Sequence, residues 1–369
     1  MIHQKHLCIA PQHSRRAQFW EKALAGKQEP MLFLTYLDVI ADRLFLEKDA
    51  HYIVRLESPG EDFETYKAIL LLGCTTSAER EKVVLLKENF GEISNFDLWN
   101  KGWKRLLLKI DGLRGQYQLS FLNTPTSIAI LFEKRQAQQL LQTAHINCPF
   151  ILEPCSTYEA LLAEMSRQSL KQVFIKPTSG SSASGVMAFR YLNPNKQALY
   201  TTVVKKEGKF YNSLHLQRYH LSADIEELIN HLCNGETIIE KWIPKWSFQG
   251  LSIDFRVVVI AGKAEFVVPR GSKHMITNLH LGNQKLTESQ CGIDELQLQK
   301  IKQVAEEALN CFPNIHYAGI DVLLDRKGKN AYVLELNAFG DMLLNISNPQ
   351  GESVYDIEYR QLFDDGLLR

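Results

Sequence analysis

Two apolar runs near the C-terminal end of the sequence, residues 318–324 (AGIDVLL) and 331–337 (AYVLELN), are joined by a short polar turn. Such runs are typical of β-strands, and so short a connection favours an antiparallel hairpin. Side chains alternate between the two faces of a strand, so Glu335 and Asn337 share a face. Pairing across the hairpin can bring Asp321 beside them. The pattern therefore predicts two adjacent strands with a polar cluster on one face.

The three polar side chains of this hairpin, Asp321, Glu335 and Asn337, all offer oxygen atoms. Two carboxylates and an amide oxygen form a hard, oxygen-only group, which suits a Mg²⁺ ion that bridges nucleotide phosphates. Acidic side chains are mostly exposed in proteins, so they could instead form the solvent-facing side of an amphipathic hairpin. The sequence predicts a metal site here, with a plain surface hairpin as the alternative.

Length and composition limit what surrounds the hairpin. With 369 residues, of which 45% are hydrophobic, the chain can bury more than one core, and two or three domains are expected. Basic and acidic residues both number 42, so no overall charge favours nucleic acid or an anionic membrane as a partner. The seven cysteines are scattered and never spaced as CxxC, which argues against a disulfide framework or a zinc site.

The N-terminal residues carry charge, and no apolar run approaches the ~20 residues that a transmembrane helix needs. We therefore expect a soluble, cytoplasmic protein.

Changes of pattern along the chain predict three units. Residues 1–130 alternate apolar runs with helical stretches, as in a small α/β domain. A helical period at 133–144, followed by an extended proline-containing stretch, begins a central unit at 131–240, and 241–369 form the last unit.

A second polar cluster follows a predicted strand that ends in Lys176 and Pro177. Glycine and serine let backbone N–H groups approach phosphate oxygens closely, and a lysine adds a point charge. The Walker A pattern is absent, and a plain surface loop is the alternative. Lys134, at the start of a predicted helix, could be a second phosphate contact, or simply solvated. The small residues of the loop after Pro177 are Gly180, Ser181, Ser182, Ser184 and Gly185.

The next cluster is a predicted strand end at Glu240 and Lys241, followed by Trp242, Ile243 and Pro244. Proline stops the strand, and the extended segment exposes backbone N–H and C=O groups that could meet the edge of an adenine ring. Trp242 and Ile243 could pack against that ring. The alternative for Trp242 is a buried tryptophan at a domain junction.

A basic cluster lies on two consecutive predicted strands. Arg256 is near the start of one strand and Arg270 near the end of the next, so an antiparallel pair could bring the two guanidinium groups together. Together they would stabilise charge on a transferring phosphoryl group or a tetrahedral intermediate. For Arg256 the alternative is a surface ion pair with Asp254. Lys273 and Asn278 follow in the same region and are candidate substrate contacts.

Taken in order, these pieces resemble the ATP-grasp superfamily over about residues 133–346, and most closely its amino-acid ligase and glutathione-synthetase-like branches. The resemblance implies an α/β fold with an N-terminal Rossmann-like pre-ATP-grasp domain, a small central lid subdomain and a C-terminal α+β subdomain. It implies that ATP and Mg²⁺ are bound, and Mn²⁺ could replace Mg²⁺.

The resemblance also implies residue roles. Lys134 and Lys176 would hold phosphates, and residues 180–185 would form a mobile phosphate flap. Asp254 could face the ribose, although family members usually place that acid nearer the hinge. The other implied roles are adenine contacts by Glu240, through its side chain or backbone, and by Lys241 and Ile243, metal ligation by Asp321, Glu335 and Asn337, and contacts of Arg256 and Arg270 with the γ-phosphate and acyl phosphate. After Asn337 the chain reads Ala-Phe-Gly-Asp, which departs from many ligases and makes the acceptor pocket unfamiliar.

Residues 55–63 (RLESPGEDF) resemble an element of an uncharacterised bacterial ATP-grasp subfamily whose substrates are unknown. Ser58 as N-cap, Pro59 at the first helical position and Glu61 form the pattern of a capping box. Arg55 and this helix N-terminus could bind a carboxylate or phosphate of the substrate. A well-capped strand-to-helix turn without a ligand is the alternative.

The resemblance implies a ligase that activates a carboxylate as an acyl phosphate and joins it to an amine or another nucleophile. The acid would be a small molecule or a peptide, and a homodimer is the default assembly. Two alternatives remain open: a kinase that stops at a phosphorylated product, and a nucleotide-binding partner protein without catalysis.

Overall fold

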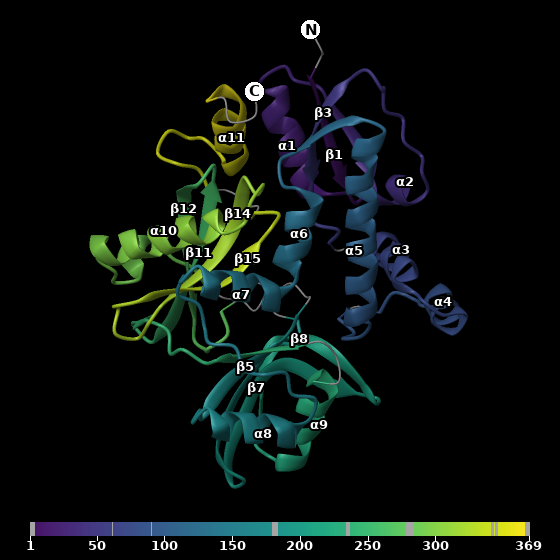
Figure 1. Ribbon diagram of the computed structural model, residues 1–369. Helices are drawn as coiled ribbons and strands as arrows, with labels where there is room; N and C mark the ends of the chain where they lie inside the picture. Colours follow the sequence, from purple (N-terminus) through teal and green to yellow (C-terminus); the bar gives the residue numbers. More distant parts are fainter. Residues whose placement is uncertain are drawn as a thin grey trace.

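The computed structural model describes residues 4–60, 62–89, 91–178, 184–233, 237–277, 284–340, 343 and 346–365. Figure 1 shows one sheet in the N-terminal part of the chain, one in the C-terminal part beside it, and a third in the central part, with α6 and α7 between the central part and the other two. Within the described residues, no helix is long and apolar enough to cross a membrane.

The N-terminal sheet is parallel, which fits the predicted α/β domain. Parallel neighbours need crossover connections, and helices supply them here. The strand order is β2 (Met31–Thr35), β1 (Gln4–Ala10), β3 (His51–Leu56) and β4 (Gln118–Phe121). The helices are α1 (Arg15–Ala25), α2 (Tyr36–Ile40), α3 (Phe63–Gly73), α4 (Ser77–Val84) and α5 (Phe96–Gly112), with a 3₁₀ turn at Leu113–Gly115.

Helices α3 and α5 touch backbone to backbone through two glycines. A Cβ on Gly102 would lie 1.8 Å from the Ile69 carbonyl oxygen, and one on Gly73 would lie 2.1 Å from that of Leu98. Neither neighbour is a flexible side chain that could move aside. The close approach of the two helices therefore depends on both glycines.

We expect Gly102→Ala to lower the free energy of unfolding by about 1–3 kcal/mol, because the added methyl group must push the two helix backbones apart. Gly112→Ala is the matched control, since Gly112 lies on the same helix with no atom within 4 Å of its added Cβ. It should be neutral or stabilising by up to about 1 kcal/mol. Urea unfolding of both variants checks this, and equal stability of the two would contradict it.

The turn after β3 differs from the predicted capping box. Helix α3 begins at Phe63, and its N-cap is Asp62, whose carboxylate accepts a hydrogen bond of 2.7 Å from the Thr65 N–H. Gly60 has φ +29°, outside the helical range, so the chain turns before the helix starts. The prediction of Ser58 as N-cap is therefore wrong, and Glu61 lies outside the described residues.

The central part holds an antiparallel sheet in the order β8-β7-β6-β5-β9, with α8 and α9 packed against it (Figure 1). Helices α6 (Pro125–Phe132) and α7 (Lys134–Thr143) lead into it. Its elements are α8 (Tyr158–Arg167), β5 (Gln172–Pro177), β6 (Met187–Asn193), β7 (Lys196–Lys206), β8 (Lys209–Tyr219), α9 (Ser222–Cys233) and β9 (Thr237–Lys241). The edge strand β8 was not predicted from the sequence.

The C-terminal sheet is antiparallel in the order β13-β12-β11-β14-β15, and β10 also pairs with β11. Its elements are β10 (Ser247–Phe248), β11 (Leu251–Ile260), β12 (Lys263–Ser272), β13 (Gln284–Lys285), a 3₁₀ turn at Glu288–Gln290, α10 (Glu295–Asn310), β14 (Tyr317–Leu324) and β15 (Ala331–Asn337). Helix α11 (Val354–Tyr359), extended by a π-helical turn at Arg360–Asp364, returns to pack beside α1 (Figure 1).

The predicted hairpin is confirmed. Strands β14 and β15 pair antiparallel with Asp321 opposite Glu335 and Gly319 opposite Asn337. The register shifts between Asp321 and Val322, next to the polar pair. Because opposed residues of an antiparallel pair point to the same face, the two carboxylates lie side by side.

A buried charge cluster joins the N-terminal sheet to the C-terminal part. Arg55 of β3 is 1% exposed, and its guanidinium bonds Glu57 Oε1 at 2.6 Å and Glu358 Oε2 of α11 at 2.5 Å. Three aromatic rings also surround the guanidinium carbon, at 4.5 to 5.1 Å from their centroids: Trp20, Tyr317 and Tyr355. A buried, paired cation of this kind links the two parts of the chain.

Candidate functional site

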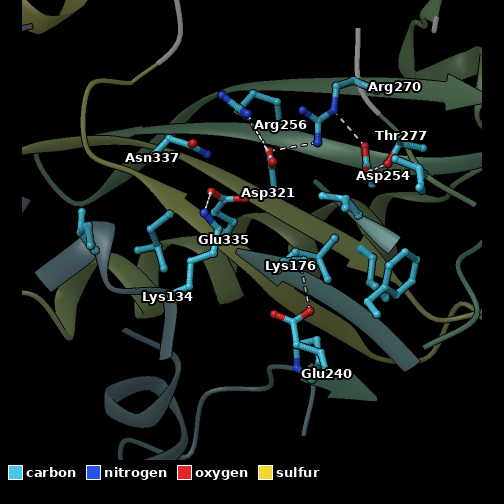
Figure 2. Close-up of a pocket in the computed structure, with 18 of the residues that line it drawn as sticks. Lys134, Lys176, Glu240, Asp254, Arg256, Arg270, Thr277, Asp321, Glu335 and Asn337 are labelled. Atoms are coloured by element: carbon cyan, nitrogen blue, oxygen red, sulfur yellow. Dashed lines mark hydrogen bonds and ion pairs between the residues drawn. The ribbon is translucent and has the colours of Figure 1, made fainter. Parts of the chain in front are cut away.

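A cavity of about 330 Å³ opens between the central and C-terminal sheets, with some walls from the N-terminal domain. Figure 2 shows labelled side chains from both sheets, from α7 (Lys134) and from the segment after β12 (Thr277) that point toward one another. The cavity contains most of the predicted site residues: Ser58, Lys134, Lys176, Ser184, Glu240, Lys241, Ile243, Asp254, Arg256, Arg270, Asp321, Glu335 and Asn337.

The polar face of the β14–β15 hairpin forms one wall. Lys134 Nζ lies 3.2 Å from Glu335 Oε1, which places the helix-initial lysine of α7 over this wall. The amide nitrogen of Asn337 donates to the Gly319 carbonyl at 3.1 Å, so the amide oxygen is the atom left to serve as a metal ligand. Two carboxylates and one amide oxygen are donors that Mg²⁺ accepts.

The donor set fits a metal that is only partly held by protein. Within the described part of the chain, no group of three or more His, Cys, Asp or Glu side chains could form an all-protein metal site. Mg²⁺ usually keeps waters and takes substrate phosphates as further ligands. Asp321, Glu335 and Asn337 therefore suit a magnesium ion shared with a nucleotide.

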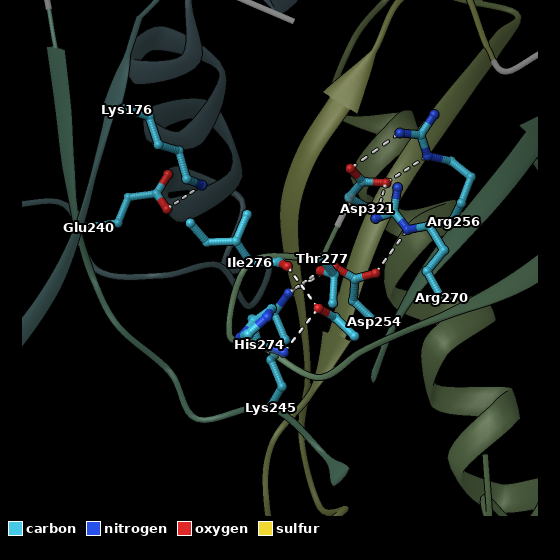
Figure 3. A network of polar contacts seen from close by, with 11 residues as sticks. Lys176, Glu240, Lys245, Asp254, Arg256, Arg270, His274, Ile276, Thr277 and Asp321 are labelled. Carbon is cyan, nitrogen blue, oxygen red and sulfur yellow. Dashed lines mark hydrogen bonds and ion pairs between the residues drawn. The ribbon is translucent and has the colours of Figure 1, made fainter. Parts of the chain in front are cut away.

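The two predicted arginines converge on one carboxylate. Arg256 Nε lies 2.6 Å from Asp321 Oδ1, and Arg270 Nη2 lies 3.0 Å from the same oxygen (Figures 2 and 3). Burial acts to raise the pKa of Asp321, but the attraction of the two guanidinium groups outweighs it and lowers the pKa to about 2. The side chain is therefore ionised throughout the physiological range.

Asp254 is a second carboxylate that pairs with Arg270, and it is 1% exposed. Its carboxylate accepts from Arg270 Nε at 2.9 Å and from Lys245 Nζ at 2.8 Å, and Thr277 also bonds it (Figure 3). Burial acts to raise its pKa, and the two cations bring the pKa below its ordinary value. With these bonds, Asp254 is held as a structural link, an arrangement that does not favour the ribose contact.

Lys245 and Thr277 are cavity residues that the sequence reading missed. Burial lowers the pKa of the Lys245 amine, although Asp254 pulls it upward. Both residues lie outside the strands and bond Asp254 of β11. The one sequence signal was the position of Lys245 directly after the hinge proline.

Lys176 faces the hairpin from the central sheet. Its ammonium bonds Glu240 Oε2 at 2.6 Å, and Gln138 of α7 donates to Glu240 Oε1 at 2.6 Å. Burial acts to lower the pKa of Lys176, but Glu240 and the hairpin acids raise it above its ordinary value. The Glu240 side chain thus holds a lysine.

Of the hinge residues 241–243, two line the cavity and one is buried beside it. Lys241 and Ile243 line the cavity. Trp242 is 7% exposed and packs against Phe174, with ring centroids 5.1 Å apart, and against Arg190. Trp242 is thus a buried tryptophan at the junction and does not itself line the cavity.

The remaining predicted residues fall in three groups. Gly185 has φ +71° and packs against Pro177, where a Cβ would lie 2.9 Å from the proline ring. Lys273 is exposed and does not line the cavity, and neither does Arg55, which is buried in the cluster described above. The other predicted residues, Gly180, Ser181, Ser182 and Asn278, lie outside the described residues.

In a comparison with protein families, the model for the YheC/D like ATP-grasp family matches residues 129–342. That span contains the candidate phosphate, hinge and metal residues named above and also Arg256 and Arg270, whereas Arg55 and Ser58 lie before it. A comparison with curated protein sequences found no match.

Solved structures share the fold at low sequence identity. D-cycloserine synthetase DcsG is 13% identical with a TM-score of 0.57, covering 98% of this chain and 99% of that chain. A RiPP-associated ATP-grasp ligase of Chryseobacterium gregarium, in complex with ADP and a leader and core peptide, is 12% identical with a TM-score of 0.57, covering 99% and 98%. The ATP-grasp ligase PsnB, complexed with a phosphomimetic variant of its minimal precursor, Mg and ADP, is 13% identical with a TM-score of 0.53, covering 99% of both chains.

Proposed function

Because this chain belongs to the YheC/D-like ATP-grasp family and has the ATP-grasp fold, we propose that it uses MgATP to activate a carboxylate and joins it to an amine or another nucleophile. The observation that carries this proposal is the arrangement of charge in one cavity. Two lysines and two arginines surround the acidic face of the β14–β15 hairpin, in the manner expected for a triphosphate and its metal.

The proposed reaction has two steps. An oxygen of the substrate carboxylate attacks the γ-phosphorus of ATP, the bond from phosphorus to the bridging oxygen breaks, and ADP leaves. The nucleophile then attacks the carbonyl carbon of the acyl phosphate, the carbon–oxygen bond to phosphate breaks, and an amine nucleophile gives up a proton. No side chain of the protein becomes covalently bonded.

The residues of the cavity would contribute charge and position to these steps. Lys134 and Lys176 would neutralise phosphate oxygens, and Ile243 with the hinge backbone would hold the adenine. Arg256 and Arg270 would stabilise the charge of the transferring phosphoryl group. When bound at the hairpin, Mg²⁺ would supply further neutralisation of phosphate charge.

We expect ATP turnover to depend on an acid and a nucleophile. Purified protein is incubated with MgATP and pooled amino acids, small acids and peptides, and ADP release is measured. A pool that raises ADP release is then divided until single compounds remain. Mass spectrometry of the product should show a mass equal to the two substrates minus one water, with phosphate released.

The outcomes separate the proposal from its alternatives. A stable phosphorylated product without ligation would select a kinase. Tight MgATP binding without turnover in any pool would select a nucleotide-binding partner protein. Absence of MgATP binding would contradict the nucleotide site itself.

A further inference from the structure

Among the described residues of the N-terminal domain, Arg16 of α1 is the cation that lines the cavity. Its guanidinium Nη1 donates to the Phe339 carbonyl at 3.2 Å, just beyond the end of β15. Arg16 was not predicted as a site residue, and the arginine that was predicted from this domain, Arg55, is buried elsewhere. Arg16 thus holds the position at the cavity that the sequence reading gave to Arg55.

Arg16 differs from the other cations of the cavity in its partners. Five cavity lysines and arginines pair with carboxylates: Lys134 with Glu335, Lys176 with Glu240, Lys245 with Asp254, Arg256 with Asp321 and Arg270 with Asp254. Among the described residues, Arg16 and Lys241 have no such pair. Lys241 belongs to the hinge, so Arg16 is the other lining cation without a carboxylate at ion-pair distance among the described residues, although its charge also acts on the buried Glu358.

Arg16 also lies close to the arginine expected at the transferring phosphate. A Cβ on Gly319 would lie 3.1 Å from Arg256 Nη1 and 3.1 Å from the Gly340 carbonyl carbon. Arg256 Nη1 and the Gly340 backbone thus both lie near Gly319, and Arg16 bonds the carbonyl of the preceding residue, Phe339. The Phe339–Gly340 turn therefore has a guanidinium group from each of two parts of the chain in its neighbourhood.

The walls around Arg16 indicate what kind of molecule would fit. Ser58 lines the same cavity with a hydroxyl group, and Leu131, Phe132 and Phe339 add apolar surface. The rings of Phe132 and Phe339 are in edge contact, with centroids 5.7 Å apart. Besides its cations and hydroxyl groups, the cavity lining thus offers aromatic and aliphatic carbon.

We propose that Arg16 binds the carboxylate that is to be activated, with Ser58 as a second polar contact, and that the acid carries an apolar body against Phe132 and Leu131. Arg16 would hold one edge of the carboxylate while Arg256 holds the phosphoryl group that it attacks. This deepens the proposed function and rests on it, because the carboxylate must meet a nucleotide in the same cavity.

The test uses a carboxylate probe and a neutral analogue of the same shape. Wild-type protein saturated with MgADP is titrated with 3-phenylpropionate and with 3-phenylpropionamide, and binding is followed by ligand-observed NMR. Arg16→Met should weaken binding of the carboxylate by ~10- to 100-fold, the usual range for one lost charge-assisted contact. Arg15→Met is the matched control, because Arg15 is the neighbouring exposed arginine of α1 and does not line the cavity. It should bind like the wild type.

Three results would overturn the proposal: the amide binding as well as the acid, the MgADP-bound wild type binding neither, or Arg16→Met binding the acid as tightly as the wild type. Arg16→Lys, which keeps the charge but loses the fork of donors, should give an intermediate affinity. MgADP affinity is measured in the same samples. Failure of the wild type to bind MgADP would count against the proposed function, whereas normal MgADP binding with no effect of Arg16 would count against this inference alone.

Discussion

Replacing Glu335 by glutamine should reduce acid-dependent ADP release by about 100- to 1,000-fold, with little change in the thermal midpoint. The carboxylate lies on the polar face of the hairpin, opposite Asp321, and its side chain is 30% exposed with one ion pair, to Lys134. Glutamine keeps the shape and removes the charge that would hold the metal against the phosphates. A loss of this size is typical when one charge-stabilising group is removed from a catalytic site.

Glu307→Gln is the matched control for this variant. Glu307 is an exposed acid of α10 in the same part of the chain, bonded to Gln303 at 2.7 Å and remote from the cavity lining. It should leave turnover and stability unchanged. Near-normal turnover of Glu335→Gln, measured beside this control, would contradict the metal assignment.

Asp321 is a less suitable site for the same experiment. Its carboxylate bonds both Arg256 and Arg270, and its side chain is 15% exposed. Removing that charge leaves two guanidinium groups close together without their shared partner. Loss of activity in Asp321→Asn would therefore mix a catalytic effect with a folding effect, which is why Glu335 gives the clearer result.

Replacing Arg55 by methionine should lower the free energy of unfolding by about 3–5 kcal/mol at neutral pH, the usual cost of removing one partner from a buried ion pair. Glu57 and Glu358 would both lose their cation while remaining buried, and three aromatic rings would lose a contact. Urea unfolding measures the change. Arg114→Met is the matched control, because Arg114 lies 4.8 Å from the ring of Phe121 and 3.4 Å from Asp111 but is 43% exposed. Its loss should cost less than about 1 kcal/mol.

The pH dependence of this variant follows from Glu358. In the wild type, burial raises the pKa of Glu358 and Arg55 acts to lower it. Without Arg55 that pKa rises further, so the folded variant takes up a proton at a higher pH than the unfolded chain does. The difference in the free energy of unfolding between the wild type and Arg55→Met should therefore be largest at neutral pH and become smaller at mildly acidic pH. If this difference in the free energy of unfolding is below about 1 kcal/mol, or if it grows on acidification, the result would contradict the structural role of the Arg55–Glu57–Glu358 cluster.

The sequence was most informative where the candidate site residues lie on neighbouring strands. The hairpin of Asp321 and Glu335 follows from strand period and a short turn, and both are local properties. The convergence of Arg256 and Arg270 follows from their places on consecutive strands, and the structure brings them to one oxygen. The resemblance to ATP-grasp proteins, based on the order of such pieces, is confirmed by the family match.

The sequence was least informative where distant segments meet. Arg55 and Glu358 are 303 positions apart, so no local pattern could show that the arginine is buried and paired. Arg16 reaches the cavity only because α1 packs near the end of β15. Strand β8 carries many partly exposed polar residues, as edge strands often do, and this weakened its alternation. Ser58 fitted a capping pattern, but Asp62 caps the helix four positions later.

The central claim, that the hairpin holds a metal against nucleotide phosphates, is tested most directly by anomalous diffraction from crystals grown with Mn²⁺ and a non-hydrolysable ATP analogue. The account predicts a manganese peak within metal–oxygen bonding distance, roughly 2.0–2.2 Å, of oxygens from Asp321 or Glu335 and of an analogue phosphate. It also predicts Lys134 and Lys176 on the opposite side of those phosphates. A peak away from the hairpin, or an analogue whose phosphates lie outside this cavity, would contradict it.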